Sequence, residues 1–288
     1  MSFWLNGEFR EGAAAIDIAD RGLLLGDGIF ETLLLVDGAP VFLTAHIARM
    51  AAGALVLKMA SRPEEQQIGA VITELAVRNG ASSGLASARV TVTRGVGPRG
   101  IELAGCEFVE TMLITVSAYE APDASAPIEL YVSQHRRNEN SATAWCKTLN
   151  YLDNILARDE AMAAGADDAV MLNMAGRVAC VSTANLFAIH EGAIVTPRVA
   201  DGALPGTVRA ALIDIATKEG LQIAEASVAH LDLNDASIFI TNSLIGLRKA
   251  RMAGAEVSGC TDDETFNRLK SCYEQSMRMD IDRRKAAS

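Results

Sequence analysis

Strand signals come ahead of helix signals in the first third of the chain, and this grouping most constrains the fold. Two hairpin turns, Asn6-Gly7 and Asp37-Gly38, separate short runs rich in Ile, Phe, Thr and Leu. Helical periodicity then predicts helices over residues 44–59 and 63–79, before strands return. Alternating strands and helices would predict a parallel sheet, whereas this grouping predicts an α+β domain with an antiparallel meander. The expected strands are residues 3–5, 28–36, 40–43, 86–94 and 108–119.

A small, proline-bearing segment, residues 121–127, is the expected linker between two domains. Residues 1–120 are predicted to form a small N-terminal α+β domain, and residues 128–288 a larger C-terminal domain. In the larger domain, closely spaced strands joined by hairpin turns predict a barrel-like, strongly curved sheet. Its expected strands are residues 128–133, 169–173, 177–181, 186–190, 193–196, 221–226 and 237–241, and its expected helices are residues 147–165, 207–219 and 262–279.

The charge balance favours small-molecule chemistry. Of the 288 residues, 36 are acidic and 26 are Lys or Arg, which gives a formal net charge of -10 and a pI of about 5.0. Nucleic acids and anionic membranes bind basic surfaces, so neither is an expected partner. No apolar run approaches the ~20 residues of a membrane span, and the first residues lack the pattern of a signal peptide. We therefore expect a cytoplasmic protein.

Cysteine and histidine residues are dispersed along the chain, which disfavours a disulfide framework or a metal centre. The cysteines show no paired spacing, and the histidines are equally scattered. A metal-dependent mechanism is therefore not expected. The cysteines are Cys106, Cys146, Cys180, Cys260 and Cys272, and the histidines are His46, His135, His190 and His230.

Lys147 lies between an apolar stretch and a predicted helix. In the first turn of a helix, the positive end of the helix dipole would disfavour an ammonium and favour a neutral amine. A neutral amine is a nucleophile that forms Schiff bases with carbonyl groups, and pyridoxal phosphate is the commonest biological carbonyl held in this way. Taken alone, a solvated lysine at a helix start is the simpler interpretation, so the neighbouring motifs must decide between the two.

A glycine opens the helix predicted from Thr207, in the segment Leu-Pro-Gly-Thr-Val-Arg at residues 204–209. Backbone N–H groups and the helix dipole at such an end bind anions, and Gly206 lets a phosphate approach closely. The alternative is a loop with a proline near the first helical position and no ligand. Residues 241–243, Thr-Asn-Ser, end a hydrophobic strand, where their side chains could form a second cradle or act only as a cap.

Arginines in two segments could bind anions. Arg49 lies among apolar positions of a predicted helix, where it could reach an anion or a buried carboxylate, although extension of its head group into solvent is the simpler interpretation. The loop at residues 94–100, Arg-Gly-Val-Gly-Pro-Arg-Gly, lacks the spacing and the following helix of a dinucleotide fingerprint. Its two arginines, Arg94 and Arg99, suit a carboxylate clamp, because a planar guanidinium binds that group bidentately.

Together, these motifs resemble the class IV, or fold-type IV, aminotransferase family, which includes D-amino-acid and branched-chain aminotransferases and aminodeoxychorismate lyases. The resemblance runs in order over nearly the whole chain, and although each block is short, seven in sequence are specific. The blocks are residues 20–22 with 26–32, residues 46–49, residues 94–100, residues 147–152 with 160–161 and 165–167, residues 184–187, residues 204–209, and residues 241–243.

The resemblance implies a two-domain fold-type IV enzyme that uses pyridoxal 5'-phosphate. Lys147 would form the Schiff base with this cofactor and later move a proton during the reaction. Arg49 would hold the phosphate, and Tyr151 would hydrogen-bond the phenolic oxygen of the cofactor. The further phosphate-binding residues that the resemblance implies are Gly206, Thr207, Val208, Asn242 and Ser243.

The resemblance also implies an amino acid and a 2-oxo acid as substrates. Phe30 and Arg99 match substrate-binding positions, and in the D-amino-acid enzymes the position of Arg99 reaches across a dimer interface to bind the substrate carboxylate. A homodimer with its active site at the interface is thus implied. Ile101 stands where the D-amino-acid enzymes have a histidine, so the resemblance does not support specificity for D-amino acids.

Cys180 is the main departure from the family pattern. The family has a glutamate five residues before the asparagine that corresponds to Asn185, and this glutamate pairs with the pyridine nitrogen of the cofactor. The carboxylate keeps the nitrogen protonated and makes the ring an electron sink, which a buried neutral thiol does not do. Either Cys180 accepts a weak hydrogen bond and the ring is less activated, or the reaction needs less carbanion stabilisation. A third account is an alignment slip, with another acid such as Glu160 in this role.

The leading prediction is therefore a pyridoxal phosphate-dependent aminotransferase. A lyase of the aminodeoxychorismate type, which releases pyruvate, is the alternative, because the same lysine and phosphate cradle would serve it. A cofactor-binding homologue that has lost activity is a third interpretation. The presence of Lys147, Tyr151 and Arg99 together argues against loss of activity.

Overall fold

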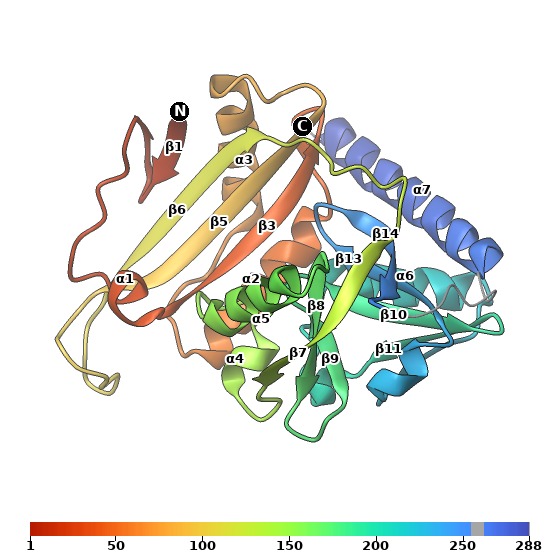
Figure 1. The fold of residues 1–288 in the computed structure, drawn as a ribbon. Helices are drawn as coiled ribbons and strands as arrows, with labels where there is room; N and C mark the ends of the chain where they lie inside the picture. Colours follow the sequence, from red (N-terminus) through yellow and green to blue (C-terminus); the bar gives the residue numbers. More distant parts are fainter. Residues whose placement is uncertain (255–261, 288) are drawn as a thin grey trace. The chain divides into compact units, whose positions relative to one another are not determined.

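The computed structural model describes residues 1–254 and 262–287, and Cys260 lies outside them (Figure 1). The chain divides into two compact units, and the change of unit after Ala121 falls in the expected linker. Two later segments group with the first unit, so the division into domains 1–120 and 128–288 stays a prediction. Unit 1 comprises Met1–Ala121, Cys146–Asn150 and Met279–Ser288, and unit 2 comprises Pro122–Trp145 and Tyr151–Arg278.

Unit 1 is built on a six-stranded antiparallel sheet in the order β2-β1-β6-β5-β3-β4. Figure 1 shows its long strands β3, β5 and β6 side by side, with the helices α2 and α3 against one face. Strand β3 pairs with β5 over its whole length, from Gly28 opposite Thr93 to Val36 opposite Leu85. The elements are β1 (Ser2–Leu5), β2 (Glu8–Glu11), α1 (Arg21–Leu25), β3 (Gly28–Val36), β4 (Ala39–Pro40), α2 (Leu43–Val56), α3 (Glu65–Arg78), β5 (Leu85–Val96) and β6 (Val109–Ala118).

The helices cover the sheet of unit 1 because their apolar stripes face its inner side. Helix α2 buries Ile47, Met50 and Ala54 at helical spacing. These side chains share one hydrophobic core with residues of β5 that alternate along the strand, such as Val90 and Val92. Full burial of such an aliphatic side chain contributes about 1.5–3 kcal/mol, which makes this core the main source of stability in the unit.

Unit 2 contains an eight-stranded sheet in the order β12-β11-β10-β13-β14-β7-β8-β9, with parallel and antiparallel pairs. The sheet curls, because the chain that follows β12 pairs with β9 at the other end of the order. The Val178 N–H donates to the Val228 carbonyl at 2.9 Å, and Arg177 bridges to Ala229. The expected barrel-like curvature is thus confirmed. The strands are β7 (Ile128–Arg137), β8 (Asp168–Asn173), β9 (Val178–Val181), β10 (Asn185–His190), β11 (Ala193–Pro197), β12 (Ile223–Ala226), β13 (Ser237–Asn242) and β14 (Gly246–Met252).

The helices of unit 2 connect and cover these strands. Helix α5 links the parallel strands β7 and β8 and packs against both, as a parallel crossover requires. Helix α6 packs near β13. The helical segments are α4 (Ala142–Trp145), α5 (Leu152–Ala163), η1 (Val199–Asp201), α6 (Thr207–Lys218), η2 (His230–Leu233) and α7 (Asp263–Ala287), of which α7 has residues in both units.

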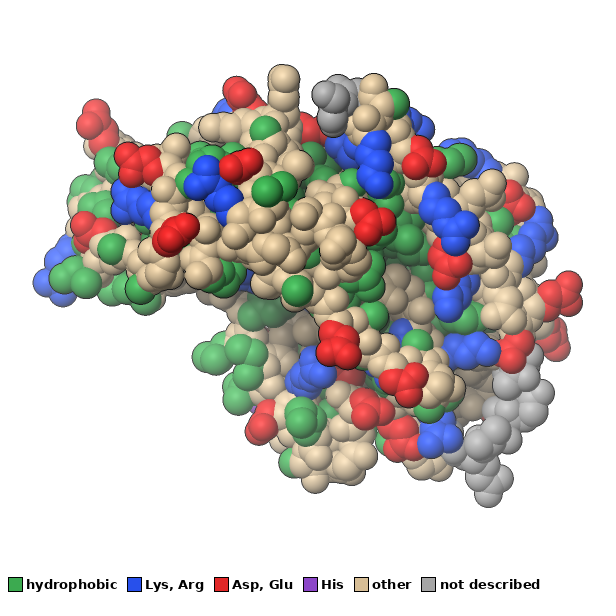
Figure 2. Space-filling view, turned by 90° about the horizontal axis from the view of Figure 1, so that it is seen from above, with side chains coloured by type: hydrophobic (Ala, Val, Ile, Leu, Met, Phe, Trp, Pro, Cys, Tyr) green, Lys and Arg blue, Asp and Glu red, His purple; other side chains and the backbone are tan. Residues whose placement is uncertain are grey.

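Acidic and basic side chains are interspersed on the face drawn in Figure 2, and no continuous basic surface is visible there. A nucleic-acid-binding surface would need such a basic area. Within the described parts of the chain, no helix has both the length and the apolar character needed to cross a bilayer. Over the same residues, no group of three or more His, Cys, Asp or Glu side chains is placed to hold a metal ion.

Candidate active site

Lys147 lies in a non-helical segment of unit 1, Cys146–Asn150. Its carbonyl accepts a hydrogen bond from the Phe30 N–H at 2.9 Å, and the Leu149 N–H donates to the Gly28 carbonyl at 2.9 Å. The predicted position in the first turn of a helix is therefore wrong, because the backbone of this segment bonds to β3, and α5 begins later, in unit 2. Lys147 therefore lacks the first-turn position on which the predicted effect of a helix dipole depends.

The glycine motif at the start of β3 lies against the Lys147 segment. At Gly28, a Cβ atom would lie 2.6 Å from a carbonyl oxygen of β5 and 2.8 Å from Leu149 Cδ1. A side chain at this position would clash with the backbone of β5 and would require the Leu149 side chain to move. The Asn150 side chain fixes the end of the segment, because its Nδ2 donates to the Gly26 carbonyl at 3.1 Å. The motif thus positions Lys147 in addition to forming a turn.

The Lys147 amine lies over the aromatic ring of Phe30, with Nζ 4.3 Å from the ring centroid. The guanidinium carbon of Arg89 lies 3.7 Å from the same centroid, so two cationic groups contact one buried ring. A planar guanidinium there could bind the carboxylate of a molecule that reacts with the amine. The sequence did not single out Arg89, although its position opposite Thr32 places it on the same face of the sheet as Phe30.

A buried carboxylate orients Arg49. Glu31 accepts hydrogen bonds from Arg49 Nε at 2.7 Å and Arg49 Nη2 at 2.6 Å, and its Oε2 lies 2.6 Å from His46 Nδ1. The exposed fractions of the three side chains are 1% for Glu31, 2% for His46 and 11% for Arg49. The sequence left open whether Arg49 reaches an anion, a buried carboxylate or solvent. In the structure it binds the buried carboxylate of Glu31.

Burial and hydrogen bonding act in opposite directions on this carboxylate. Burial raises the pKa of Glu31, but the hydrogen bonds from Arg49 and His46 outweigh it and hold the pKa below its ordinary value. Burial lowers the pKa of His46 below its ordinary value despite the neighbouring carboxylate. At neutral pH the group is therefore an ionised Glu31 that faces the Arg49 cation and a neutral imidazole.

The sequence missed Glu31 and His46, although each carries a signal. Glu31 is the one acidic residue in the otherwise apolar and Thr-bearing run of β3, and a buried carboxylate needs a partner. His46 and Arg49 are three residues apart in α2, so both face the same side of the helix. A charged residue inside a strand signal could have prompted a search for a cation at helical spacing.

In unit 2, the N-terminus of α6 lies against polar strand ends. Its N-cap is Gly206, which has no side chain to accept hydrogen bonds from the first-turn N–H groups. A Cβ atom at Gly206 would lie 2.0 Å from Asn185 Oδ1, so glycine is required for this approach. Thr207 Oγ1 lies 3.4 Å from Ser243 Oγ. The structure thus brings together two motifs that the sequence treats as separate candidates.

The same strand ends carry a buried hydroxyl group, that of Thr241, which could donate a hydrogen bond to a ligand. Thr241 is 1% exposed, and its Oγ1 finds no hydrogen-bond partner among the described residues. Thr241 stands opposite Asn185 in the β10–β13 pair, so both side chains leave the same face of the sheet. An unsatisfied buried hydroxyl costs about 1–3 kcal/mol, and an anion that accepts a hydrogen bond from it would remove this cost. These residues therefore fit a phosphate group.

Asn242 and Tyr151 have defined backbone contacts. The Asn242 Oδ1 accepts hydrogen bonds from the N–H groups of Leu244 at 2.9 Å and Ile245 at 3.0 Å, so this side chain shapes the turn that follows β13. Tyr151 is the N-cap of α5, and its carbonyl accepts the Ile155 N–H at 3.0 Å. Asn242 therefore holds the turn that contains Ser243.

Cys180 lies in β9 opposite Met171, within a small apolar cluster. Burial raises the pKa of its thiol, against an opposing effect of Arg137, so the thiol is neutral at neutral pH. Glu160, the alternative acid at this position, instead accepts hydrogen bonds from the Ser133 hydroxyl and from a backbone N–H of β7. The structure thus gives Glu160 a different role and weakens the account based on an alignment slip.

The expected carboxylate clamp of two arginines is wrong for Arg94. Its side chain is buried and binds the Asp27 carboxylate and two backbone carbonyls. Arg99 is exposed in the loop between β5 and β6. Of the two arginines of the motif, Arg99 is thus the one with an exposed side chain.

The predicted site residues fall into two groups, one in each unit. In unit 1, Lys147 contacts Phe30, and in unit 2 the residues around the start of α6 contact the end of β13. Unit 1 contains Phe30, Arg49, Arg99 and Lys147, and unit 2 contains Tyr151, Cys180, Gly206, Thr207, Val208, Asn242 and Ser243.

Comparison with known proteins supports the resemblance drawn from the motifs. The family model described as Amino-transferase class IV matches residues 28–252. A putative branched-chain-amino-acid aminotransferase of Methanocaldococcus jannaschii is 32% identical over 247 residues, which cover 84% of each chain.

Solved structures agree with this match. The branched-chain amino acid aminotransferase of Escherichia coli superposes with a TM-score of 0.86 at 22% identity, covering 96% of this chain and 94% of that one. The 4-amino-4-deoxychorismate lyase of Pseudomonas aeruginosa superposes with a TM-score of 0.80 at 27% identity, covering 93% and 98%. The expected fold-type IV architecture is confirmed, and the chain belongs to the class IV aminotransferase family.

Proposed function

We propose that this protein is a pyridoxal 5'-phosphate-dependent aminotransferase that transfers an amino group from an amino acid to a 2-oxo acid. The observation that carries the proposal is Lys147, whose segment is held along β3 with its amine over the Phe30 ring. A solvated lysine would need neither the close approach at Gly28 nor the ring contact. Membership of the class IV family supports the same assignment.

When bound, pyridoxal phosphate supplies an aldehyde for covalent attachment and a ring that accepts electrons from the substrate carbon. Lys147 is the proposed point of attachment, and its released amine is the proposed base that moves a proton at that carbon. Arg49 is proposed to bind the phosphate with a guanidinium that Glu31 holds in a fixed orientation.

The start of α6 supplies further proposed phosphate ligands. The backbone N–H groups of Thr207 and Val208 lie at the positive end of a helix, where an anion is stabilised. Gly206 permits close approach, and the hydroxyl groups of Thr207 and Ser243 add donors. Asn242 is proposed to act through the turn that it shapes.

The remaining assignments concern the ring and the substrate. Tyr151 is proposed to hydrogen-bond the phenolic oxygen of the cofactor, and Cys180 to face its pyridine nitrogen. Phe30 and Arg99 are proposed to contact the amino acid, with Arg99 on its carboxylate and Arg89 as a second cation beside the amine. A homodimer and a cytoplasmic location belong to the same proposal.

The alternative function is a lyase of the aminodeoxychorismate type. The likeness of the chain to aminodeoxychorismate lyases supports it, including the 27% identity to the lyase of Pseudomonas aeruginosa. The same lysine and phosphate ligands would serve this reaction.

One assay separates the two functions. Purified protein loaded with pyridoxal phosphate is incubated with single amino acids, and conversion of the cofactor to its pyridoxamine form is followed by absorbance. The proposal predicts conversion that reverses when a 2-oxo acid is added, with the Lys147→Ala variant as the inactive control. Pyruvate release from aminodeoxychorismate without conversion by any amino acid would instead establish the lyase.

A further inference from the structure

The loop between β5 and β6, residues 97–108, carries Arg99, and its conformation sets where this arginine can bind a carboxylate. The Arg99 side chain is exposed. A guanidinium binds a carboxylate with high affinity when its position is fixed before binding, since less ordering is then required. The contacts that hold the loop therefore bear directly on substrate affinity.

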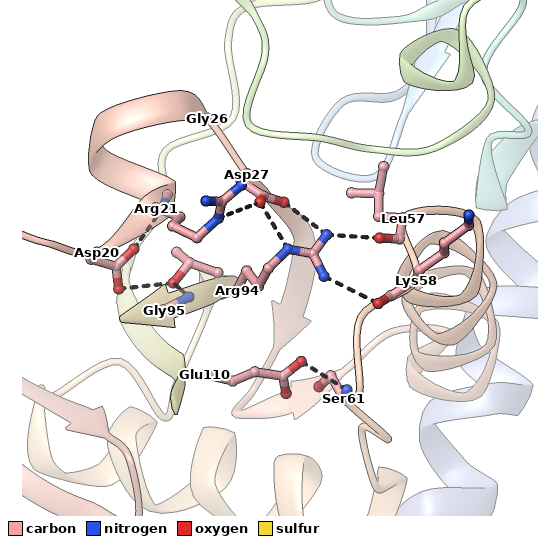
Figure 3. A network of polar contacts seen from close by, with 12 residues as sticks. Asp20, Arg21, Gly26, Asp27, Leu57, Lys58, Ser61, Arg94, Gly95 and Glu110 are labelled. Carbon is pink, nitrogen blue, oxygen red and sulfur yellow. Dashed lines mark hydrogen bonds and ion pairs between the residues drawn. The ribbon is translucent and has the colours of Figure 1, made fainter. Parts of the chain in front are cut away.

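Three charged residues lie at the base of this loop (Figure 3). The Asp27 carboxylate accepts hydrogen bonds from Arg21 Nε at 2.9 Å, from Arg94 Nε at 2.8 Å and from Arg94 Nη2 at 3.0 Å. Their side chains are 15%, 6% and 5% exposed for Asp27, Arg21 and Arg94. Burial raises the pKa of Asp27, but the bonds from Arg94 and Arg21 outweigh it and hold the pKa below its ordinary value. We call these residues the Asp27 cluster.

One side of the Asp27 cluster is attached to fixed parts of unit 1. Arg94 donates to the carbonyl of Leu57, the C-cap of α2, at 2.7 Å and to the carbonyl of the following Lys58 at 3.1 Å. Asp20, the N-cap of α1, accepts a hydrogen bond from the Thr93 hydroxyl at 2.9 Å and so ties α1 to β5. Arg21, the first residue of α1, therefore starts from a rigid support.

The other side of the cluster holds the loop. Arg21 Nη1 donates to the carbonyl of Gly100, the residue after Arg99, at 2.6 Å. The ring centroid of Phe108, the last residue of the loop, lies 5.4 Å from the guanidinium carbon of Arg21 and 5.6 Å from that of Arg94. Arg21 thus contacts the loop next to Arg99 and at its end.

Stability alone is a weak explanation for the Asp27 cluster. Removing charges from water has a large cost that their attraction only roughly offsets, so buried ion pairs fix geometry more readily than they add net stability. We infer that Arg21, held by Asp27 and Arg94, is a positioning residue that fixes the backbone beside Arg99 and so raises affinity for the substrate carboxylate. This inference rests on the proposed function, in which Arg99 binds that carboxylate.

The test uses the cofactor-loaded full chain with Arg21→Met and with Arg21→Lys, which keeps a cation beside Asp27 but lacks the forked head that also reaches Gly100. Arg10→Met, which breaks an exposed pair with Glu8, is the matched control. Trypsin cuts after arginine, so cleavage after Arg99, followed by mass spectrometry, reports how often the loop opens. KM and kcat for the amino acid are measured on the same samples.

We expect both Arg21 variants to be cut after Arg99 about tenfold faster than the wild type, the effect of losing one hydrogen bond from a charged donor. KM should rise by about tenfold and kcat should change by less than about threefold, because carboxylate binding is weakened before the chemical step. Arg10→Met should match the wild type. In Arg99→Met, adding Arg21→Met should raise KM no further, since both changes act on one interaction.

Unchanged cleavage and KM in Arg21→Lys would overturn the inference even if Arg21→Met failed to fold. A wild type that transfers amino groups, with an unchanged KM in Arg99→Met, would overturn the inference and leave the proposed function standing. A wild type without this activity would refute the proposed function. Faster cleavage in Arg21→Lys would then limit Arg21 to holding the loop, which overturns its role in substrate affinity.

Discussion

Replacing Glu31 by glutamine perturbs the buried carboxylate that orients Arg49. The variant keeps the shape of the side chain and one acceptor oxygen but removes the negative charge. Arg49, with an 11% exposed side chain, would then be a largely buried cation without its counter-charge. Glutamine could also place its amide N–H₂ group at the position of Oε2, which now accepts a hydrogen bond from Arg49 Nη2 and contacts His46 Nδ1.

The size of the effect follows from this burial. Removing one partner of a buried ion pair costs about 3–5 kcal/mol, and we expect about 3 kcal/mol because Arg49 retains some access to water. Single domains have free energies of unfolding of about 5–15 kcal/mol, so this loss is a large fraction of the total. Loss of the fixed guanidinium should also weaken binding of pyridoxal phosphate by about tenfold, which corresponds to about 1.4 kcal/mol.

The sign of the pH dependence follows from the two pKa shifts. The folded pKa of Glu31 lies below its unfolded value, so its stabilisation is complete above the unfolded pKa and is lost as the pH falls through the folded value. The pKa of His46 is also lowered, so the native state loses further stability as the pH falls below the unfolded histidine value of about 6.5. The difference between wild type and Glu31→Gln should therefore be constant above neutral pH and shrink in acid.

Urea unfolding at neutral pH, followed by circular dichroism, measures the stability difference, and titration with pyridoxal phosphate measures the affinity. Glu74→Gln is the control, because it breaks the exposed pair with Arg78 and should change stability by about 0–0.5 kcal/mol. A loss below about 1 kcal/mol in Glu31→Gln, similar to the control, would refute the argument from the buried pair.

Two further substitutions test unit 2. Thr241→Val removes a buried hydroxyl that lacks a partner among the described residues, so it should stabilise the cofactor-free protein by about 1 kcal/mol and weaken binding of pyridoxal phosphate. Thermal unfolding with and without cofactor measures both effects, and a destabilised cofactor-free variant would contradict the assignment. Cys180→Glu should increase the rate of amino-group transfer by placing a carboxylate at the proposed pyridine-nitrogen position. An unchanged or lower rate with normal cofactor binding would show that the proposed position of Cys180 is wrong.

Local signals account for the parts of the fold that the sequence predicts well. The strand expected over residues 28–36 coincides with β3, Gly28–Val36, because an apolar run and a following Asp-Gly turn define both ends. Helix α6 begins at Thr207 as expected, after a glycine that must be there because of Asn185. Strands β2 and β14 were not expected, because β2 is exposed throughout and β14 carries three charged residues among its other positions.

Contacts between distant parts of the sequence account for what was missed. Lys147 was expected in a helix, but its segment forms hydrogen bonds with β3, more than a hundred residues earlier. No local sequence pattern predicts this pairing. Arg94 was expected to take part in a carboxylate clamp for a ligand, but its side chain binds the distant Asp27 carboxylate. The motif order identified the residues of the candidate site, whereas the ion pairs that orient them required the structure.

Reduction of the cofactor-loaded protein with borohydride, followed by peptide mass spectrometry, tests the central claim most directly. The reduction makes a Schiff base permanent and so marks the lysine that carries the cofactor. We predict the added pyridoxyl mass on the peptide that contains Lys147, and its absence in Lys147→Ala. An unmodified Lys147 peptide in a protein that has been saturated with pyridoxal phosphate would contradict the account.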